Sequence, residues 1–272
     1  MENSFVDKVY KSVDYKVEKV DNNLFNYAIR AIAAGMFLTL IYTFVTQLSS
    51  DFIAGDASLG VPIAKLLMSY LFGIGLVFII FMGAELFTSN TMYLTIGVTH
   101  KKTTAKKWIK VLVICWVFNF VGAALGAFLL VKTGLFHSGG ELLNPYLYEL
   151  AAKKSTLPLD QIFFRAILAN WVVCVVVYIA GVAKDDIGKM FIVPLGLMPF
   201  VYLGFEHSIA NFGVFLMTWF TPGGVDASYH GELFNTIGAF KNLGVATLGN
   251  IIGGAVLVGC YFAFLHRKKI NK

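Results

Sequence analysis

The sequence predicts an all-α membrane protein of six transmembrane helices, arranged as two inverted repeats of three helices in which the second and fifth helices are broken. Three observations support this prediction: an apolar composition, six long apolar runs, and short motifs that recur in the same order in both halves. Hydrophobic residues make up 57% of the 272 residues and charged residues only 14%, and the mean hydropathy is +0.72. Soluble domains carry about 25% charged residues, so the composition indicates a membrane protein.

Six apolar runs are long enough to cross the roughly 30 Å hydrocarbon layer, which takes about 20 helical residues. We expect one transmembrane domain, with an N-terminal amphipathic helix over 1–25, a six-span bundle over 26–265 and a tail over 266–272. The runs are residues 27–46, 61–81 with an extension to 98, 108–131, 162–182, 190–220 and 245–265.

The polar N-terminal segment has no cationic start leading into an apolar run, so we expect no cleaved signal peptide. Its apolar residues recur at three- and four-residue intervals with lysines between them, which predicts an amphipathic helix on the cytoplasmic membrane face or against the bundle. Such a helix could anchor the protein or gate it. The apolar positions are Phe5, Val9, Val13, Val17 and Val20.

The net charge of +6 reflects lysines and arginines that cluster in alternate segments between the apolar runs. With six spans, these segments fall on one side of the membrane, and the positive-inside rule makes that side cytoplasmic. We therefore expect a multi-pass protein of the plasma or inner membrane with both termini in the cytoplasm and no nucleic-acid partner. The cysteines Cys115, Cys174 and Cys260 lie within apolar runs, so we expect no disulfide, metal site or cofactor.

Three motif pairs indicate the repeat. Residues 83–90 and 204–211 share the form Gly-x-Glu-x-x-x-x-Asn, residues 30–34 and 165–169 share Arg-Ala-Ile-x-Ala, and residues 119–122 and 250–253 share Asn-x-x-Gly. A duplicated unit of three spans enters the membrane from opposite faces, which places both polar interruptions near the midplane. Broken helices at that depth line a cavity or lie within protein, so we expect a central pathway.

The interruptions contain the candidate functional residues. Glu85 and Glu206 occupy equivalent places, and we interpret them, with Asn90 and Asn211, as structural tethers that accept backbone N–H bonds and hold the breaks. The alternative is a carboxylate pair for acid–base chemistry. His207 has the apolar counterpart Leu86, and we expect it at the pathway rather than as a satisfied core histidine, because polar groups at membrane depth are usually functional.

The stretches 83–89, 205–211 and 249–254 resemble the formate/nitrite transporter family, and the resemblance covers nearly the whole chain from Asn26 to the last span. It implies a homopentamer in which each protomer has an aquaporin-like fold and its own pore for small monovalent anions. Residues 86–98 and 170–174 are more similar to the nitrite and hydrosulfide channels of the family than to the formate channel.

The resemblance also implies roles for single residues. It places the apolar constrictions at Phe72, Leu76 and Phe200, the pore threonine at Thr88, the central histidine at His207, and the outer-vestibule lysine at Lys154. Asn170 and Asn250 are similar to structural or pore-near asparagines, and Leu86 is expected in the pore opposite the histidine. Lys154 would attract anions from outside, unless it is one of a solvated pair with Lys153.

These residues predict a passive, pH-dependent channel for nitrite, formate or hydrosulfide, in which His207 is a proton donor or hydrogen-bond partner. A proton-coupled secondary transporter of the same anions is the alternative. An intramembrane enzyme that uses Ser208 and His207 is remote, because adjacent helical residues point about 100° apart and the chain has no nucleophile elbow or zinc motif. We therefore expect no enzymatic activity.

Overall fold

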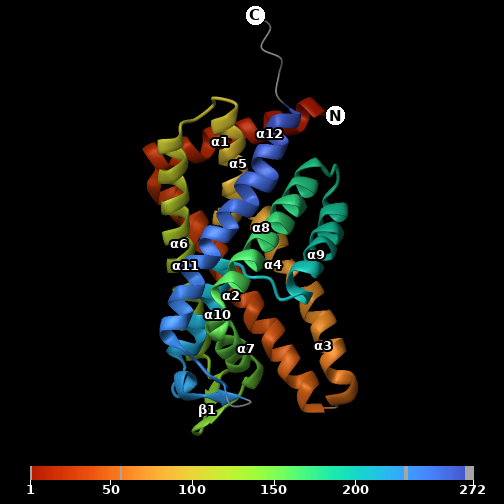
Figure 1. The fold of residues 1–272 in the computed structure, drawn as a ribbon, viewed down its shortest axis with the longest axis vertical. Coiled ribbons are helices and arrows are strands. Elements are labelled where there is room, and N and C mark those ends of the chain that lie inside the picture. Colours follow the sequence, from red (N-terminus) through yellow and green to blue (C-terminus); the bar gives the residue numbers. More distant parts are fainter. Residues whose placement is uncertain (1, 56, 230–231, 267–272) are drawn as a thin grey trace, which may run out of the picture.

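The computed structural model describes residues 2–55, 57–229 and 232–266, and helices make up almost all of it (Figure 1). The predicted tail over 266–272 lies outside the described residues except for His266. In the first half, the helices are α1 (Glu2–Asn22), α2 (Leu24–Gly55), α3 (Ala57–Leu71), α4 (Gly73–Phe81), α5 (Phe87–Thr99) and α6 (Ala105–Lys132).

The second half repeats the order with additions in its connections. Two short antiparallel hairpins pair His137 with Leu142 and Ser228 with Leu233. The elements are β1 (His137–Ser138), β2 (Glu141–Leu142), α7 (Pro145–Thr156), α8 (Leu159–Val182), α9 (Asp186–Tyr202), α10 (Ser208–Phe220), η1 (Gly224–Asp226), β3 (Ser228–Tyr229), β4 (Glu232–Leu233), α11 (Thr236–Ile252), the π-helix η2 (Gly253–Cys260) and α12 (Tyr261–Leu265).

Within the described residues, five helical stretches are long and apolar enough to cross a membrane: Leu24–Phe52, Pro62–Phe81, Ala105–Lys132, Leu159–Val182 and Thr236–Leu265. The fifth predicted span, over 190–220, is divided between α9 and α10, and each of these is shorter than the roughly 20 residues that a span needs. The second span is likewise divided, with α3 and α4 on one side of its break and α5 on the other. Both predicted breaks are therefore present.

Two spans are longer than the apolar runs predicted. The helix of the first span continues to Gly55. Its threonine and serine hydroxyls are satisfied by backbone carbonyls of the preceding turn, as Thr46 donates to Tyr42 O at 2.8 Å and Ser49 to Val45 O at 2.8 Å. The last span begins at Thr236, where the Oδ1 of Asn235 accepts the Gly238 N–H at 2.9 Å and caps the helix.

The two halves pack in the same way. Helix α2 lies against α6 so closely that a Cβ on Gly122 would be 2.0 Å from Ile32 O, and α8 lies against the last span so that a Cβ on Gly253 would be 2.2 Å from Ile167 O. The Asn-x-x-Gly motifs thus provide glycines for close helix approach, as small residues do in membrane bundles.

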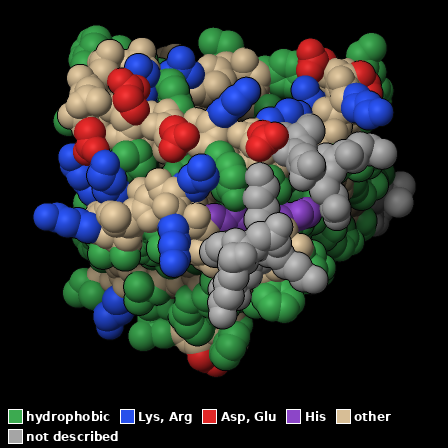
Figure 2. All heavy atoms as spheres, turned by 90° about the horizontal axis from the view of Figure 1, so that it is seen from above, with side chains coloured by type: hydrophobic (Ala, Val, Ile, Leu, Met, Phe, Trp, Pro, Cys, Tyr) green, Lys and Arg blue, Asp and Glu red, His purple; other side chains and the backbone are tan. Residues whose placement is uncertain are grey.

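The start of α1 and the end of α12 lie at one end of the bundle, which we call the terminal end; α7 and the hairpins lie at the opposite loop end (Figure 1). Helix α1 crosses the terminal end and packs against the bundle, with Val9 and Val13 buried. The view onto the terminal end shows lysine, arginine and acidic side chains scattered over this face, with hydrophobic side chains around the rim (Figure 2). The amphipathic helix therefore covers the bundle.

Candidate functional site

The two breaks have the same backbone conformation. Each helix before the break ends in a glycine with positive φ, +60° at Gly83 and +67° at Gly204, which L side chains rarely adopt. The chain then extends through Leu86 at φ −107° and ψ 125° and through His207 at φ −119° and ψ 112°. The next helix starts at the following residue, so Leu86 and His207 occupy equivalent N-cap positions.

Asn119 and Asn250 hold these extended segments. The Oδ1 of Asn119 accepts the Phe87 N–H at 2.9 Å, and the Oδ1 of Asn250 accepts the Ser208 N–H at 2.9 Å. Each amide nitrogen donates to two carbonyls, one in the break and one in the neighbouring span. Both asparagines are fully buried. Asn250 is thus placed as a tether of the break, and Asn119 is its counterpart, which the sequence marked only as part of a repeat.

The prediction that Glu85 and Glu206 accept backbone N–H groups is wrong. Among the described residues, their side chains bind other side chains: Glu85 accepts from Lys16 at 2.5 Å and from Asn90 at 3.0 Å, and Glu206 accepts from Lys154 at 2.8 Å and from Asn211 at 2.6 Å. The backbone donors are satisfied by Asn119 and Asn250. Asn90 and Asn211 do lie at the breaks as predicted, and each binds the glutamate of its own loop.

The alternative of Lys154 as one of a solvated pair with Lys153 is wrong. Lys154 lies in α7, and its side chain is only 6% exposed beside that of Glu206, which is 1% exposed. A buried ammonium needs a partner because burial of an unpaired charge is very costly. Lys16 of α1 has the same relation to Glu85, with side chains 8% and 6% exposed. Sequence reasoning missed Lys16, although both lysines lie in the helix that precedes an Arg-Ala-Ile motif.

Five predicted residues line one narrow cavity in the middle of the bundle. Its volume is about 10 Å³, roughly enough for a single water molecule. The Phe72 and Phe200 rings close one side of the cavity edge to face, with their centroids 5.7 Å apart. His207 is the one polar side chain among the residues that line this cavity, which we call the central chamber: Leu38, Phe72, Leu76, Leu86, Val173, Leu197, Phe200 and His207.

Hydrogen bonds orient the His207 ring. Its Nδ1 accepts the Ala210 N–H at 3.2 Å, so a neutral ring carries its hydrogen on Nε2. Nε2 lies 3.0 Å from the Oγ1 of Thr88 in the other half, and the geometry therefore makes Nε2–H the donor and Thr88 the acceptor. The two breaks meet through this hydrogen bond.

Asn170 lies behind Thr88 rather than among the residues that line the chamber. Its amide nitrogen donates to Thr88 O at 3.2 Å, to Thr91 Oγ1 at 3.0 Å and to Asn250 O at 2.6 Å. Asn170 is fully buried. It therefore connects both breaks and fixes the backbone that presents the Thr88 hydroxyl.

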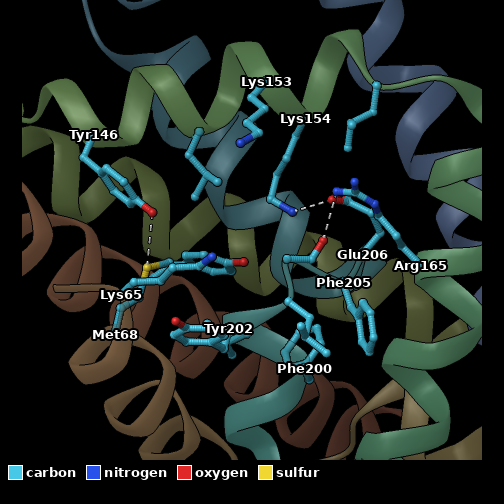
Figure 3. A pocket seen from close by; sticks show the side chains of 16 residues that line it. Lys65, Met68, Tyr146, Lys153, Lys154, Arg165, Phe200, Tyr202, Phe205 and Glu206 are labelled. Atoms are coloured by element: carbon cyan, nitrogen blue, oxygen red, sulfur yellow. Dashed lines mark hydrogen bonds and ion pairs between the residues drawn. The ribbon is translucent and has the colours of Figure 1, made fainter. Parts of the chain in front are cut away.

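A cleft opens towards each end of the molecule. The loop-end cleft, with about 890 Å³ of empty space, is lined by Lys154, Glu206 and Phe200, and the terminal-end cleft, with about 770 Å³, is lined by Lys16, Glu85 and Leu76. Phe200 and Leu76 also line the central chamber. Figure 3 shows the Lys154 ammonium pointing at Glu206 in the loop-end cleft. The clefts and the chamber thus follow one another through the protomer.

Solved structures with similar folds were found. One described as "FNT family ion channel" matches with a TM-score of 0.84 and 27% identity over 97% of this chain and 99% of that chain. Another, "Pentameric formate channel with formate bound", matches with a TM-score of 0.75 and 25% identity over 90% of this chain and 98% of that chain. These matches confirm the predicted fold class, including the aquaporin-like protomer.

Curated relatives agree. The "Probable formate transporter" of Methanothermobacter thermautotrophicus is 37% identical over 79% of this chain and 81% of its own length. The "Nitrite transporter NirC" of Salmonella typhimurium is 33% identical over 72% of this chain and 70% of its own length. The similarity thus extends to proteins named for formate and for nitrite. The family model described as Formate/nitrite transporter matches residues 4–264, and the chain belongs to the formate/nitrite transporter family.

Proposed function

We propose that this protein is a channel for small monovalent anions of weak acids, namely nitrite, formate or hydrosulfide, with one pathway in each protomer. The single observation that carries the proposal is the central chamber, an apolar space whose one polar lining residue is His207. The chamber lies between two clefts that contain cations. A pathway of this kind suits a solute that is charged in the clefts and neutral in the middle.

The physical reason is the cost of desolvation. Removing a carboxylate-sized ion from water costs several kcal/mol even after relaxation of the protein, so Phe72, Leu76 and Phe200 hinder a bare anion. A weak acid avoids this cost, because an apolar surrounding favours the protonated form of an acid. Nitrite, formate and hydrosulfide all have such a neutral form.

The geometry favours His207 as a hydrogen-bond partner of the neutral acid. A proton on Nδ1 would face the Ala210 N–H, which Nδ1 accepts at 3.2 Å, and the positive end of α10 disfavours an imidazolium at its N-cap. The proton that an anion takes up then comes from water in the cleft. At the chamber, the Nε2–H of His207 is the group that replaces the lost water, and it is oriented by the Thr88 hydroxyl 3.0 Å away.

The membrane setting completes the proposal. The lysine-rich segments support a cytoplasmic position for the terminal end and both termini, with the loop end outside the plasma or inner membrane. A homopentamer is proposed because the similar formate channel is pentameric and because many large apolar side chains of the bundle, such as Phe44, Phe128 and Phe164, are exposed on the protomer. Lipid and neighbouring protomers would cover these side chains.

Proteoliposome flux tests the proposal. We expect the wild-type protein to conduct nitrite, formate and hydrosulfide down their gradients, and His207→Ala to alter anion selectivity or the dependence of flux on pH between 5 and 8 while the oligomer stays intact. His137→Ala is the matched control, because His137 lies in β1 at the loop end. Passage of water or glycerol without any of the three anions would refute the channel.

Two further outcomes are decisive. Accumulation against a gradient that requires a proton gradient would replace the channel with the proton-coupled transporter. Wild-type flux in His207→Ala at every pH from 5 to 8 would remove the histidine from the mechanism.

A further inference from the structure

The last span changes from an α-helix to a π-helix at Gly253. The π-helix η2 is the one π-helix within the described residues. In the repeat that pairs Asn119 with Asn250, the equivalent segment of the first half is 122–129, which belongs to the regular α-helix α6. Segments of π-helix are rare and frequently occur at functional sites. The difference between the two halves therefore calls for a local explanation.

Gly254 of the π-helix lies against the side chains that bind the backbone of Thr88. A Cβ at this glycine would be 2.0 Å from Thr91 Oγ1, 2.4 Å from Asn170 Nδ2 and 3.0 Å from Cys174 Sγ. The same three groups donate to the Thr88 carbonyl oxygen, at 2.6 Å, 3.2 Å and 3.5 Å respectively. The missing side chain of Gly254 thus leaves the space in which the three donors to Thr88 O lie.

The first half has small apolar residues at the equivalent places. Ala123, which is fully buried in α6, is the counterpart of Gly254, and Gly35 is the counterpart of Asn170. Because Gly35 has no side chain, the backbones of α2 and α6 approach so closely that a Cβ there would be 2.1 Å from Asn119 O. The second half accommodates an amide at this place instead, and there the last span is π-helical.

We propose that Gly254, within the π-helix of the last span, is a positioning residue that keeps Thr88 in place for its hydrogen bond with His207. The inference rests on the proposed channel function and adds a residue that acts on the chamber from behind. Three donors hold the Thr88 carbonyl, and the Thr88 Oγ1 lies 3.0 Å from His207 Nε2. A displacement of about 1 Å breaks such a bond. A side chain at position 254 would therefore separate Thr88 from the His207 ring.

Close helix packing alone explains other glycines of the bundle. A Cβ on Gly253 would be 2.2 Å from Ile167 O, and its counterpart Gly122 has the same relation to Ile32 O at 2.0 Å. Gly254 differs, because the atoms that exclude a side chain there are the polar groups that bind Thr88. Its counterpart is an alanine, so the repeat itself does not require a glycine at this position.

The test measures formate and nitrite flux per folded protein in proteoliposomes, with folding checked by size-exclusion chromatography. We expect Gly254→Ala to lower formate flux about tenfold, because small displacements of positioned groups have large effects on rate. The ratio of formate to nitrite flux should change in the same direction as in Thr88→Val. Thr91→Val removes one donor to Thr88 O without adding an atom near Gly254, and should give a smaller change of the same kind. Thr91→Ser keeps the hydroxyl and should behave as the wild type.

Gly259→Ala is the matched control in the same π-helix. A Cβ there would be 2.9 Å from the Cβ of Thr95, one turn beyond Thr91 in α5, so we expect lower thermal stability with wild-type flux per folded protein. Wild-type flux and flux ratio in Gly254→Ala, or equal losses of flux in Gly254→Ala and Gly259→Ala, would overturn the positioning role. If Gly254→Ala does not fold, wild-type flux in Thr91→Val overturns it. Absence of formate and nitrite flux in the wild-type protein would instead refute the channel itself.

Discussion

The two broken loops of the molecule are nearly the same structure with different side chains at the centre. Both have a glycine with positive φ, a buried glutamate paired with a lysine, and an asparagine that accepts the first backbone N–H of the following helix. They differ where they face each other. His207 has Leu86 as its counterpart, and Thr88 has Ile209.

The shared contacts stabilise the broken helices, and the contact that is not shared lies at the chamber. What the loops share is what any broken helix needs at membrane depth, because unpaired backbone groups and lone charges are costly there. What they do not share is one hydrogen bond, from His207 in one loop to Thr88 in the other. The repeat thus explains the tethers and ion pairs, and the polar pair at the chamber calls for a functional explanation.

The buried ion pairs should show the largest effect. We expect Lys154→Met to destabilise the protein by about 3–5 kcal/mol, because it leaves Glu206 as an unpaired buried carboxylate. Lys16→Met should cost less, since Glu85 is slightly more exposed, at 6% against 1%, and lines the terminal-end cleft. The midpoint of thermal unfolding in detergent measures both effects.

The control for this comparison removes the charge of the partner glutamate as well. Combining Lys154→Met with Glu206→Gln removes both charges and should recover part of the lost stability, because the glutamine oxygen still accepts from Asn211 and Asn242, which donate to Glu206 at 2.6 and 3.0 Å. Equal shifts for the two lysine variants, or no recovery in the double variant, would contradict the proposed burial of an unpaired charge.

Replacing the asparagine tethers, Asn119 and Asn250, should give the second-largest loss of stability. The two replacements should differ in their effect on anion flux. Asn119→Ala and Asn250→Ala each leave the first backbone N–H of the helix after the break without its acceptor and remove one donor from two carbonyls, and an unsatisfied buried group costs about 1–3 kcal/mol. We expect similar losses of thermal stability for the two variants. Anion flux per folded protein should fall much further in Asn250→Ala, because Asn250 holds the loop that carries His207.

We would measure anion flux and thermal stability for both asparagine variants. The ratio of their fluxes tests whether Asn250 positions the loop that carries His207. If Asn119→Ala reduced flux as much as Asn250→Ala at equal stability, the position of the histidine would not depend on its own tether.

Sequence patterns predicted the breaks and the inverted repeat, because these depend on motifs that recur and on the cost of polar groups in lipid. The apolar chamber residues Phe72, Leu76 and Phe200 were expected only from the family resemblance, and Leu38, Val173 and Leu197, which also line the chamber, were not predicted. The partners of Glu85 and Glu206 could not be predicted. Lys16 and Lys154 lie in α1 and α7, outside the spans, and an amphipathic pattern does not show which polar residue of a helix turns inward. Helix α7 itself was expected as part of a loop, because its 12 residues are too few for a span and too polar for an apolar run.

The asparagines illustrate the same limit. Asn119 was recognised by its spacing to Gly122, and its motif explains the close contact of α6 with α2. Its side-chain oxygen accepts the Phe87 N–H at 2.9 Å. This is a tertiary contact between residues 32 positions apart, and it forms only when the break packs against α6. Spacing identified the residue, and only the folded chain showed its partner.

The polar pair across the chamber should give a smaller effect on stability and a selective effect on flux. Thr88→Val removes the acceptor of the His207 Nε2–H and should cost about 1–3 kcal/mol, while flux and its pH dependence change by several-fold. Thr88→Ser keeps the hydroxyl and should behave as the wild type. Ile209→Val is the matched control at the counterpart position. Flux in Thr88→Val that equals wild type would place the hydroxyl outside the pathway.

The smallest effect concerns how the equivalent lysine-bearing helices α1 and α7 are attached. Helix α1 is held by charge: hydrogen bonds from Lys110, at 2.7 Å, and from Lys107 lower the pKa of Asp21 below its usual value of about 3.9. Apart from the buried Lys154–Glu206 pair, which has its counterpart in Lys16–Glu85, helix α7 is attached through neutral groups, with Ser50 donating to Asn144 at 2.9 Å and Ser155 accepting the Asn235 N–H at 3.0 Å.

The two attachments therefore differ in their response to acid. Because the pKa of Asp21 is lower in the folded protein than in the unfolded chain, its contribution is fully present above about pH 4 and is lost as the pH falls through the folded pKa. We expect hydrogen exchange of α1 to quicken relative to that of α7 between pH 5 and 3, and Asp21→Asn to show the faster exchange already at pH 5 with no further acid step. If hydrogen exchange of α1 in Asp21→Asn still quickened between pH 5 and 3, another carboxylate of the same helix, such as Asp14 or Glu18, would be responsible. That result would contradict the proposal that Asp21 attaches α1 through its bonds with Lys107 and Lys110.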